Sequence, residues 1–280
     1  MSALRIATIG GAWLSAERAR SGVLALSRLL APHGYRLLVF KGAYLAHCVA
    51  ADPWIREMND ADVVLVGGDF GGAVRLLEQA PGWEVLGVAQ AARPLRYQGR
   101  FHVDLHETAL PPFFGRLTNE ALRARATDVP VEIFGPGVCA PDPIDAATIT
   151  IAKFVEDRLG VECHGQTGED LQLLQARAGV EAGALAARLE EHGLRMTGIV
   201  ALAALSKRIP AFRAWLDALE PRAIELAWAR TVEPLLLRGL GRHGTWVLVR
   251  LLSDHPLDAY AGVRFRLRAL RHRLPLPSWP

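Results

Sequence analysis

The sequence predicts an α/β protein with a Rossmann-like or flavodoxin-like, mainly parallel sheet in residues 1–165 and an all-helical subdomain in residues 166–280. Short Val/Ile/Leu-rich runs alternate with stretches of helical periodicity in the first part, as in a sheet covered by helices. Several of these runs end in glycine-rich turns, which join a strand to a helix. After residue 165 the apolar residues recur with helical spacing.

Composition places the chain among globular proteins. Of its 280 residues, 51% are hydrophobic and 22% are charged, and the net charge is only +3, which excludes disorder for most of the chain. The three cysteines, Cys48, Cys139 and Cys163, form no C-x-x-C pair and are too few for a disulfide framework. The first residues do not resemble a signal peptide, and no apolar run is long enough to span a membrane. We therefore expect a cytoplasmic protein.

Residues 1–165 contain the expected strands, each a short apolar run bounded by a turn or a helical stretch. The strands are expected at 4–9, 35–40, 62–66, 84–88, 100–106, 129–134 and 161–164. The helices between them are expected at 15–32, 43–58, 74–79 and 144–159, the second interrupted near Pro53.

Residues 166–280 show helical spacing between glycine and proline interruptions. The helices are expected at 169–178, 180–191, 198–206, 211–218, 222–239 and 246–252, the last of which is also compatible with a strand. No linker separates the two parts, so the helices are expected to pack on the sheet as a subdomain.

Glycine-rich turns after the expected strands are candidate ligand contacts. In a doubly wound sheet, ligands bind at the carboxyl ends of the strands, where glycine lets backbone N–H groups approach an anion. The candidate ligand-binding residues are Gly10, Gly11, Gly67, Gly68, Asp69, Gly71 and His164. The structural alternative is that tight strand-to-helix turns need glycine without any ligand.

The run 64–69, Val-Leu-Val-Gly-Gly-Asp, resembles the strand and GGD turn with which phosphofructokinases and NAD kinases hold nucleotide phosphates. Those families continue with Gly and then Ser or Thr, whereas Phe70 and Gly71 follow here. A G-x-G-x-x-G motif and a Walker A motif do not occur in the sequence, which argues against a dinucleotide site or a P-loop.

The sharpest polar cluster lies on the expected strand at 100–106. Alternation along a strand places His102, Asp104 and His106 on one face, where two imidazoles and a carboxylate form a workable ligand set for zinc, iron or manganese. Asp104, His106 and the following Glu107 are the candidate catalytic residues for acid–base chemistry. The alternative is the solvent-facing side of an edge strand.

Asp104-Leu105-His106 also resembles the strand that carries the last zinc-ligand histidine of zinc carboxypeptidases and aspartoacylase-like enzymes. That resemblance implies a ligand role for His106 alone. The upstream H-x-x-E pair of those families does not occur here, since Gly-Tyr-Arg follows His33 and Cys-Val-Ala follows His47.

The carboxyl-terminal region is basic, with ten arginines against four acidic residues in 221–280. Within it, residues 263–274 alternate arginine with apolar side chains. This segment is a candidate surface for an acidic protein partner or a membrane. Nucleic acid is not expected as a partner, because the sequence contains neither a zinc finger nor an RNA-binding motif with interleaved aromatic residues.

These features favour an enzyme that binds a small phosphorylated or carboxylated molecule at the carboxyl edge of the sheet, a transferase or a hydrolase. One alternative is a metal-dependent hydrolase that uses His102, Asp104 and His106, with a divalent metal as its cofactor. The other is a non-catalytic scaffold protein that docks a partner through its arginine-rich end.

Overall fold

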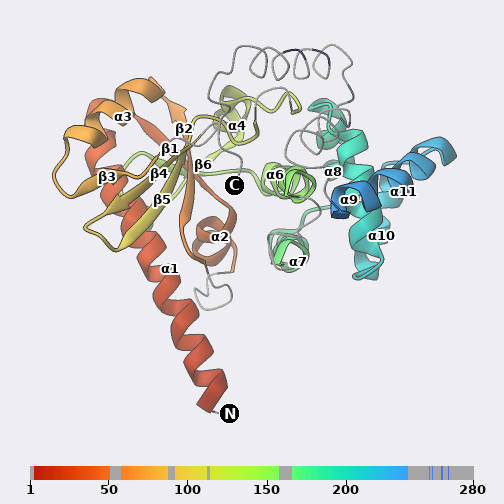
Figure 1. Ribbon diagram of the computed structural model, residues 1–280, viewed down its shortest axis with the longest axis horizontal. Coiled ribbons are helices and arrows are strands. Elements are labelled where there is room, and N and C mark those ends of the chain that lie inside the picture. Colours follow the sequence, from red (N-terminus) through yellow and green to blue (C-terminus); the bar gives the residue numbers. More distant parts are fainter. Residues whose placement is uncertain are drawn as a thin grey trace. The chain divides into compact units, whose positions relative to one another are not determined.

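The computed structural model describes residues 3–50, 58–87, 92–111, 114–157 and 166–238, together with residues 252, 254, 260 and 264, and the side chains from residue 11 onward (Figure 1). The chain forms two compact units. The first contains Met1–Ala109 and Thr118–Asp142, and the second contains Leu110–Leu117 and the chain from Pro143 onward. This division falls earlier in the chain than the boundary expected at residue 165.

The first unit contains a seven-stranded sheet in the order β3-β4-β5-β2-β1-β7-β6. Its strands are β1 (Arg36–Phe40), β2 (Ala61–Gly67), β3 (Trp83–Val85), β4 (Ala92–Tyr97), β5 (Phe101–His106), β6 (Thr127–Asp128) and β7 (Val138–Ala140). The pairs β1–β7 and β2–β5 are parallel, and the other four pairs are antiparallel.

The α/β class is confirmed, but the sheet is mixed and the mainly parallel Rossmann-like or flavodoxin-like arrangement is not confirmed. The turn at Gln98–Arg100 sends β5 back along β4, so a hairpin stands where a crossover was expected. Apolar runs indicate that a strand is buried, but they do not indicate its direction in the sheet.

The chain begins with a long helix, α1 (Ala3–Leu30), so the strand expected at 4–9 was wrong. Ala12, Ala16, Ala19, Val23 and Leu26 are buried at alternating spacings of four and three residues, which is one face of a helix. α1 contacts β5 and β2 with this face (Figure 1). Gly10 and Gly11 therefore lie inside a helix and not in a turn after a strand.

The remaining helices of the first unit are short. They are α2 (Lys41–Tyr44) with a π-helical turn at Leu45–Val49, α3 (Phe70–Gln79), α4 (Asn119–Arg125) and α5 (Val131–Phe134). α5 replaces the strand expected at 129–134, because the chain turns into a helix directly after Pro130. The expected strands at 35–40, 62–66 and 100–106 are confirmed by β1, β2 and β5.

From Pro143 onward, the elements described in the second unit are helices. They are α6 (Pro143–Glu156), α7 (Gln166–Ala178), α8 (Ala182–Glu191), α9 (Arg195–Ser206), a 3₁₀ turn (Pro210–Phe212), α10 (Arg213–Ala218) and α11 (Ala223–Arg238). Arg188 of α8 forms an ion pair with the fully buried Asp145 of α6. The elements expected at 161–164 and 246–252 lie outside the described ranges, apart from Leu252. Among the described residues, no helix is long and apolar enough to cross a membrane.

Candidate functional site

Three side chains that can bind a metal ion meet on one face of the sheet. Asp62 of β2 and Asp104 and His106 of β5 each offer one ligand atom, and these atoms lie within 4.8 Å of one another. The parallel pairing sets Asp62 opposite Asp104 and Val64 opposite His106. Because side chains alternate along a strand, all three polar groups point to the face opposite the buried Val63 and Leu105.

Asp62 is the centre of this group. Its Oδ1 lies 2.9 Å from Nζ of Lys41 and 3.0 Å from Nε2 of His106. The side chains of Asp62 and His106 each expose only 11% of their surface. Burial by itself would raise the pKa of Asp62, but the charge of Lys41 and the hydrogen bond and charge of His106 outweigh burial and hold that pKa well below its usual range.

Lys41 reaches Asp62 from the end of β1. The pairing of β1 with β2 sets Phe40 opposite Asp62, so Lys41 begins α2 directly beside the carboxylate. Its backbone has φ of 51°, in the left-handed region that a long side chain rarely adopts. The His106 ring packs edge-on against Phe40, with ring centroids 5.3 Å apart, and this contact fixes the imidazole at the group.

Carboxylate oxygens and an imidazole nitrogen suit a divalent cation such as Mn²⁺, Mg²⁺ or Zn²⁺. The three side chains already bring one ligand atom each within 4.8 Å of the others, so one ion could contact all three after a small movement of the side chains. The Lys41 ammonium lies 2.9 Å from Oδ1 of Asp62 and therefore stands beside the position that an ion would take. The residues therefore fit a metal ion.

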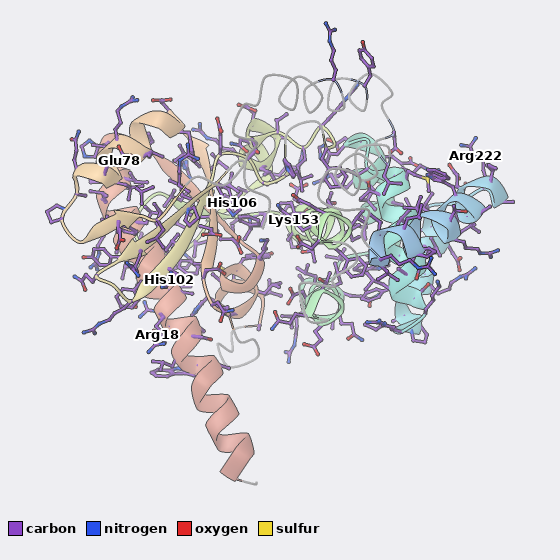
Figure 2. The ribbon with its side chains drawn as sticks, in the orientation of Figure 1. Arg18, Glu78, His102, His106, Lys153 and Arg222 are labelled. Atoms are coloured by element: carbon purple, nitrogen blue, oxygen red, sulfur yellow. The ribbon has the colours of Figure 1, made fainter. Side chains whose placement is uncertain are left out.

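The observed group differs from the predicted metal ligands in one residue. Asp104 and His106 belong to the group, whereas His102 is exposed at the start of β5 and lies outside it (Figure 2). Asp62, from the neighbouring strand, takes the third place. Glu107 is exposed just after β5, and its backbone oxygen accepts a hydrogen bond from Nδ2 of Asn119 at 2.7 Å.

Sequence reasoning missed Asp62 and Lys41. Asp62 opens a run of apolar residues, and Lys41, one of three lysines in the chain, directly follows a buried strand. A charged residue at the end of a buried strand is the signal that could have found both. Neither position reveals its partner in the sequence, because the contact depends on which strands are neighbours.

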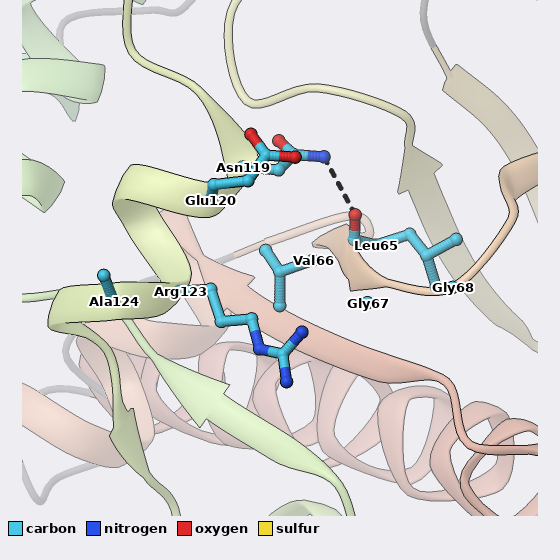
Figure 3. A pocket seen from close by; sticks show the side chains of 8 residues that line it. All are labelled: Leu65, Val66, Gly67, Gly68, Asn119, Glu120, Arg123 and Ala124. Carbon is cyan, nitrogen blue, oxygen red and sulfur yellow. Dashed lines mark hydrogen bonds between the residues drawn. The ribbon is translucent and has the colours of Figure 1, made fainter.

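Two of the predicted glycines line a pocket of about 520 Å³ at the carboxyl end of β2 (Figure 3). Its lining residues are Leu65, Val66, Gly67, Gly68, Asn119, Glu120, Arg123 and Ala124. Nδ2 of Asn119 donates a hydrogen bond to the backbone oxygen of Leu65 at 2.9 Å, which fixes the start of α4 against the strand (Figure 3). Ligand contact at Gly67 and Gly68 stays a prediction, now with a pocket beside it.

The other predicted ligand residues have structural roles or lie elsewhere. The Asp69 carboxylate accepts a hydrogen bond from the backbone N–H of Gly72 at 2.6 Å and so caps α3, which already contains Gly71. Gly10 and Gly11 lie inside α1, where the proposed anion-binding turn does not exist. His164, and residues 263–274 apart from Arg264, lie outside the described residues.

Fold and site together define an α/β protein with a carboxylate–imidazole group, able to hold a cation, on the central strands of a mixed sheet. Residues 13–207 match the family described as "Uncharacterised nucleotidyltransferase", and the chain belongs to this family. The matched segment includes Lys41, Asp62, Asp104 and His106. The family is none of those suggested by the local GGD and Asp-Leu-His resemblances.

Among solved structures, the chain is similar to an antigenic nucleotidyltransferase-like protein from Paracoccidioides brasiliensis. The two share 18% sequence identity with a TM-score of 0.44, and the match covers 73% of this chain and 94% of that chain. No curated protein matches the chain significantly.

Proposed function

We propose that this protein transfers a nucleotidyl group from a nucleoside triphosphate to an acceptor, with a divalent cation held by Asp62, Asp104 and His106. The observation that carries the proposal is the meeting of these three ligand atoms within 4.8 Å, in a chain of a family described as nucleotidyltransferases. The small anionic ligand expected from the sequence would then be the nucleotide.

The cation would neutralise charge on the triphosphate as the leaving group departs. Asp62 and Asp104 would hold it with oxygen ligands from two strands paired in register, so the sheet fixes their spacing. His106 would complete the ligand set and keep Asp62 oriented through its 3.0 Å contact. Acid–base work by Asp104, His106 or Glu107 remains part of the proposal.

The test is metal-dependent nucleotide binding by the whole chain. Each of the four common ribonucleoside triphosphates, as a form that resists cleavage, is titrated into the protein with and without Mn²⁺ and followed by calorimetry. We expect binding that needs the metal in the wild type. In Asp104→Asn it should weaken by tenfold or more, because an amide is a poorer metal ligand than a carboxylate.

Glu84→Gln is the matched control. Glu84 lies in the same unit, its side chain is 56% exposed, and it pairs with Arg96 of β4, away from the group. The Glu84→Gln variant loses one negative charge, as Asp104→Asn does, and should bind Mn²⁺ and nucleotide as the wild type does. Equal binding by wild type and Asp104→Asn would overturn the proposal, as would a wild type that binds neither Mn²⁺ nor any of the four nucleotides.

Cleavable nucleotides then separate transfer from hydrolysis. A transferase should release pyrophosphate and leave the nucleotidyl group on an acceptor from a cell extract. Free nucleotide with no labelled acceptor would favour the metal-dependent hydrolase instead. A chain with no activity that is captured by acidic vesicles or acidic proteins would favour the scaffold protein.

A further inference from the structure

Lys41 occupies the place beside Asp62 that a metal ion would need. Its ammonium nitrogen lies 2.9 Å from Oδ1 of Asp62, and the same oxygen contacts Nε2 of His106 at 3.0 Å. Two of the three ligand side chains, Asp62 and His106, are thus already in contact with each other, and Oδ1 of Asp62 also contacts the lysine ammonium. A divalent ion at this group would stand within a few ångströms of the ammonium, where two positive charges repel each other.

The backbone of Lys41 is strained, whereas its side chain is partly exposed to solvent. Its backbone φ of 51° is unfavourable for a residue with a long side chain. The nitrogen lies 5.4 Å from the centre of the Phe40 ring, and the side chain is 29% exposed, so it is partly packed and retains a route to solvent. A lysine with four rotatable bonds can leave Asp62 while its backbone stays fixed.

We propose that Lys41 is an exchangeable cation: it pairs with Asp62 when the metal site is empty, and it moves to the phosphates of the nucleotide when a metal ion takes Asp62. This inference rests on the proposed function. It adds a phosphate-binding role for a residue outside the metal ligands. It also implies that metal alone binds weakly, because it must displace an ammonium, and that metal and triphosphate together bind well, because the triphosphate gives the displaced ammonium a new partner.

The first test compares wild type with Lys41→Met, which keeps the length of the side chain and removes the charge. Calorimetry with Mn²⁺ alone should show binding on the order of tenfold tighter in Lys41→Met, the size expected for removal of one neighbouring charge. With saturating Mn²⁺, the same variant should bind the uncleavable triphosphate on the order of tenfold more weakly. Lys41→Arg keeps the charge and should bind Mn²⁺ alone as weakly as the wild type.

Lys207→Met is the charge-matched control. Lys207 lies in the second unit, its side chain is 59% exposed, and it pairs with Glu233. Lys207→Met should change neither the affinity for Mn²⁺ alone nor the affinity for the triphosphate in the presence of Mn²⁺. Mn²⁺ affinity that is unchanged or weaker in Lys41→Met would overturn the exchange. A wild type and a Lys41→Met variant that both fail to bind Mn²⁺ would instead overturn the proposed metal site itself.

A second measurement uses the unaltered protein and does not depend on a variant that folds. The chain has three lysines, so acylation of Lys41 by acetic anhydride can be followed at one peptide by mass spectrometry. We expect slow acylation of the protein alone, severalfold faster acylation with Mn²⁺, and slow acylation again with Mn²⁺ and the uncleavable triphosphate. Acylation that Mn²⁺ leaves unchanged, in a protein shown by calorimetry to bind Mn²⁺, would overturn the exchange while leaving the metal site intact.

Discussion

At the scale of single residues, the site depends on charges that compensate one another within a few ångströms. A buried carboxylate such as Asp62 is costly unless cations or hydrogen-bond donors accompany it. His106 of β5 and Lys41, which directly follows β1, supply both from the two sides of β2. Asp62 can therefore be buried in the folded protein before any metal binds. An incoming metal ion would encounter Asp62 already in contact with Lys41 and His106.

Gly68 is a residue whose replacement the backbone should not tolerate. Its φ is +102°, and an added Cβ would stand 2.3 Å from Cδ1 of Tyr35. We expect Gly68→Ala to lower the free energy of unfolding by about 2–3 kcal/mol, from backbone strain and steric overlap together. Urea denaturation followed by circular dichroism measures this loss.

Two comparisons separate the causes. Gly87→Ala, at a glycine with no atom within 4 Å of an added Cβ and no positive φ, should be close to neutral. In the background of Tyr35→Ala the overlap disappears, so Gly68→Ala should cost less there and retain only the strain. A neutral Gly68→Ala in the wild-type background would contradict the structure of this turn.

At the scale of elements, strand pairing assembles the site and helix α1 supports it from the other face. β2 and β5 are adjacent and parallel, although two strands and a helix separate them in the chain. α1 approaches the sheet so closely at Gly22 that an added Cβ would lie 2.8 Å from Cγ2 of Val103. The opposite, apolar face of β5 thus packs against α1 and holds the polar face in place. The sequence pattern had predicted a strand and a separate helix in this part of the chain.

Two glycines of α1 test this assignment. Gly11 has open space around it, so Gly11→Ala should stabilise the protein by up to about 1 kcal/mol through helix propensity. Gly22→Ala should destabilise it, by about 1–3 kcal/mol, because the added methyl meets Val103. Thermal unfolding of both variants gives the comparison. A destabilising Gly11→Ala would favour the strand and turn expected from the sequence.

At the scale of the whole molecule, the helical unit has its own network of charges. Arg195 of α9 forms an ion pair with Glu225 of α11, and Arg222 donates to the same carboxylate from its backbone at 2.7 Å and its side chain at 3.0 Å. The hydrogen bond from the Arg222 side chain is the main reason that the pKa of Glu225 falls to about 2. The carboxylate thereby links two helices and the start of α11.

This depressed pKa predicts how stability depends on pH. The contribution of Glu225 is fully present above its unfolded pKa of about 4.3 and is lost as pH falls toward about 2. Glu225→Gln should therefore lower the free energy of unfolding by about 2 kcal/mol above pH 5, with the difference from wild type shrinking at lower pH. Urea denaturation at pH 6, 5, 4 and 3 measures this difference.

Asp217→Asn is the control for the pH series. Its side chain is 59% exposed in a surface pair with Arg213, a type of pair that contributes little to stability. It should leave the denaturation curve almost unchanged at every pH. A difference between wild type and Glu225→Gln that stays constant from pH 6 to pH 3 would show that ionisation of Glu225 does not contribute to folding.

The sequence by itself determined the α/β class, the buried strands around residues 36–40 and 61–67, and the one-sided polar pattern of Asp104 and His106, because burial and alternation are local properties of the chain. Tertiary structure decided the direction of the strands, the helix at residues 3–30, and the partners of the polar strand. Asp62 and Lys41 join the site only because β1 and β5 both pair with β2. Pairing between distant segments depends on the packing of the entire sheet, and no local pattern of residues specifies it.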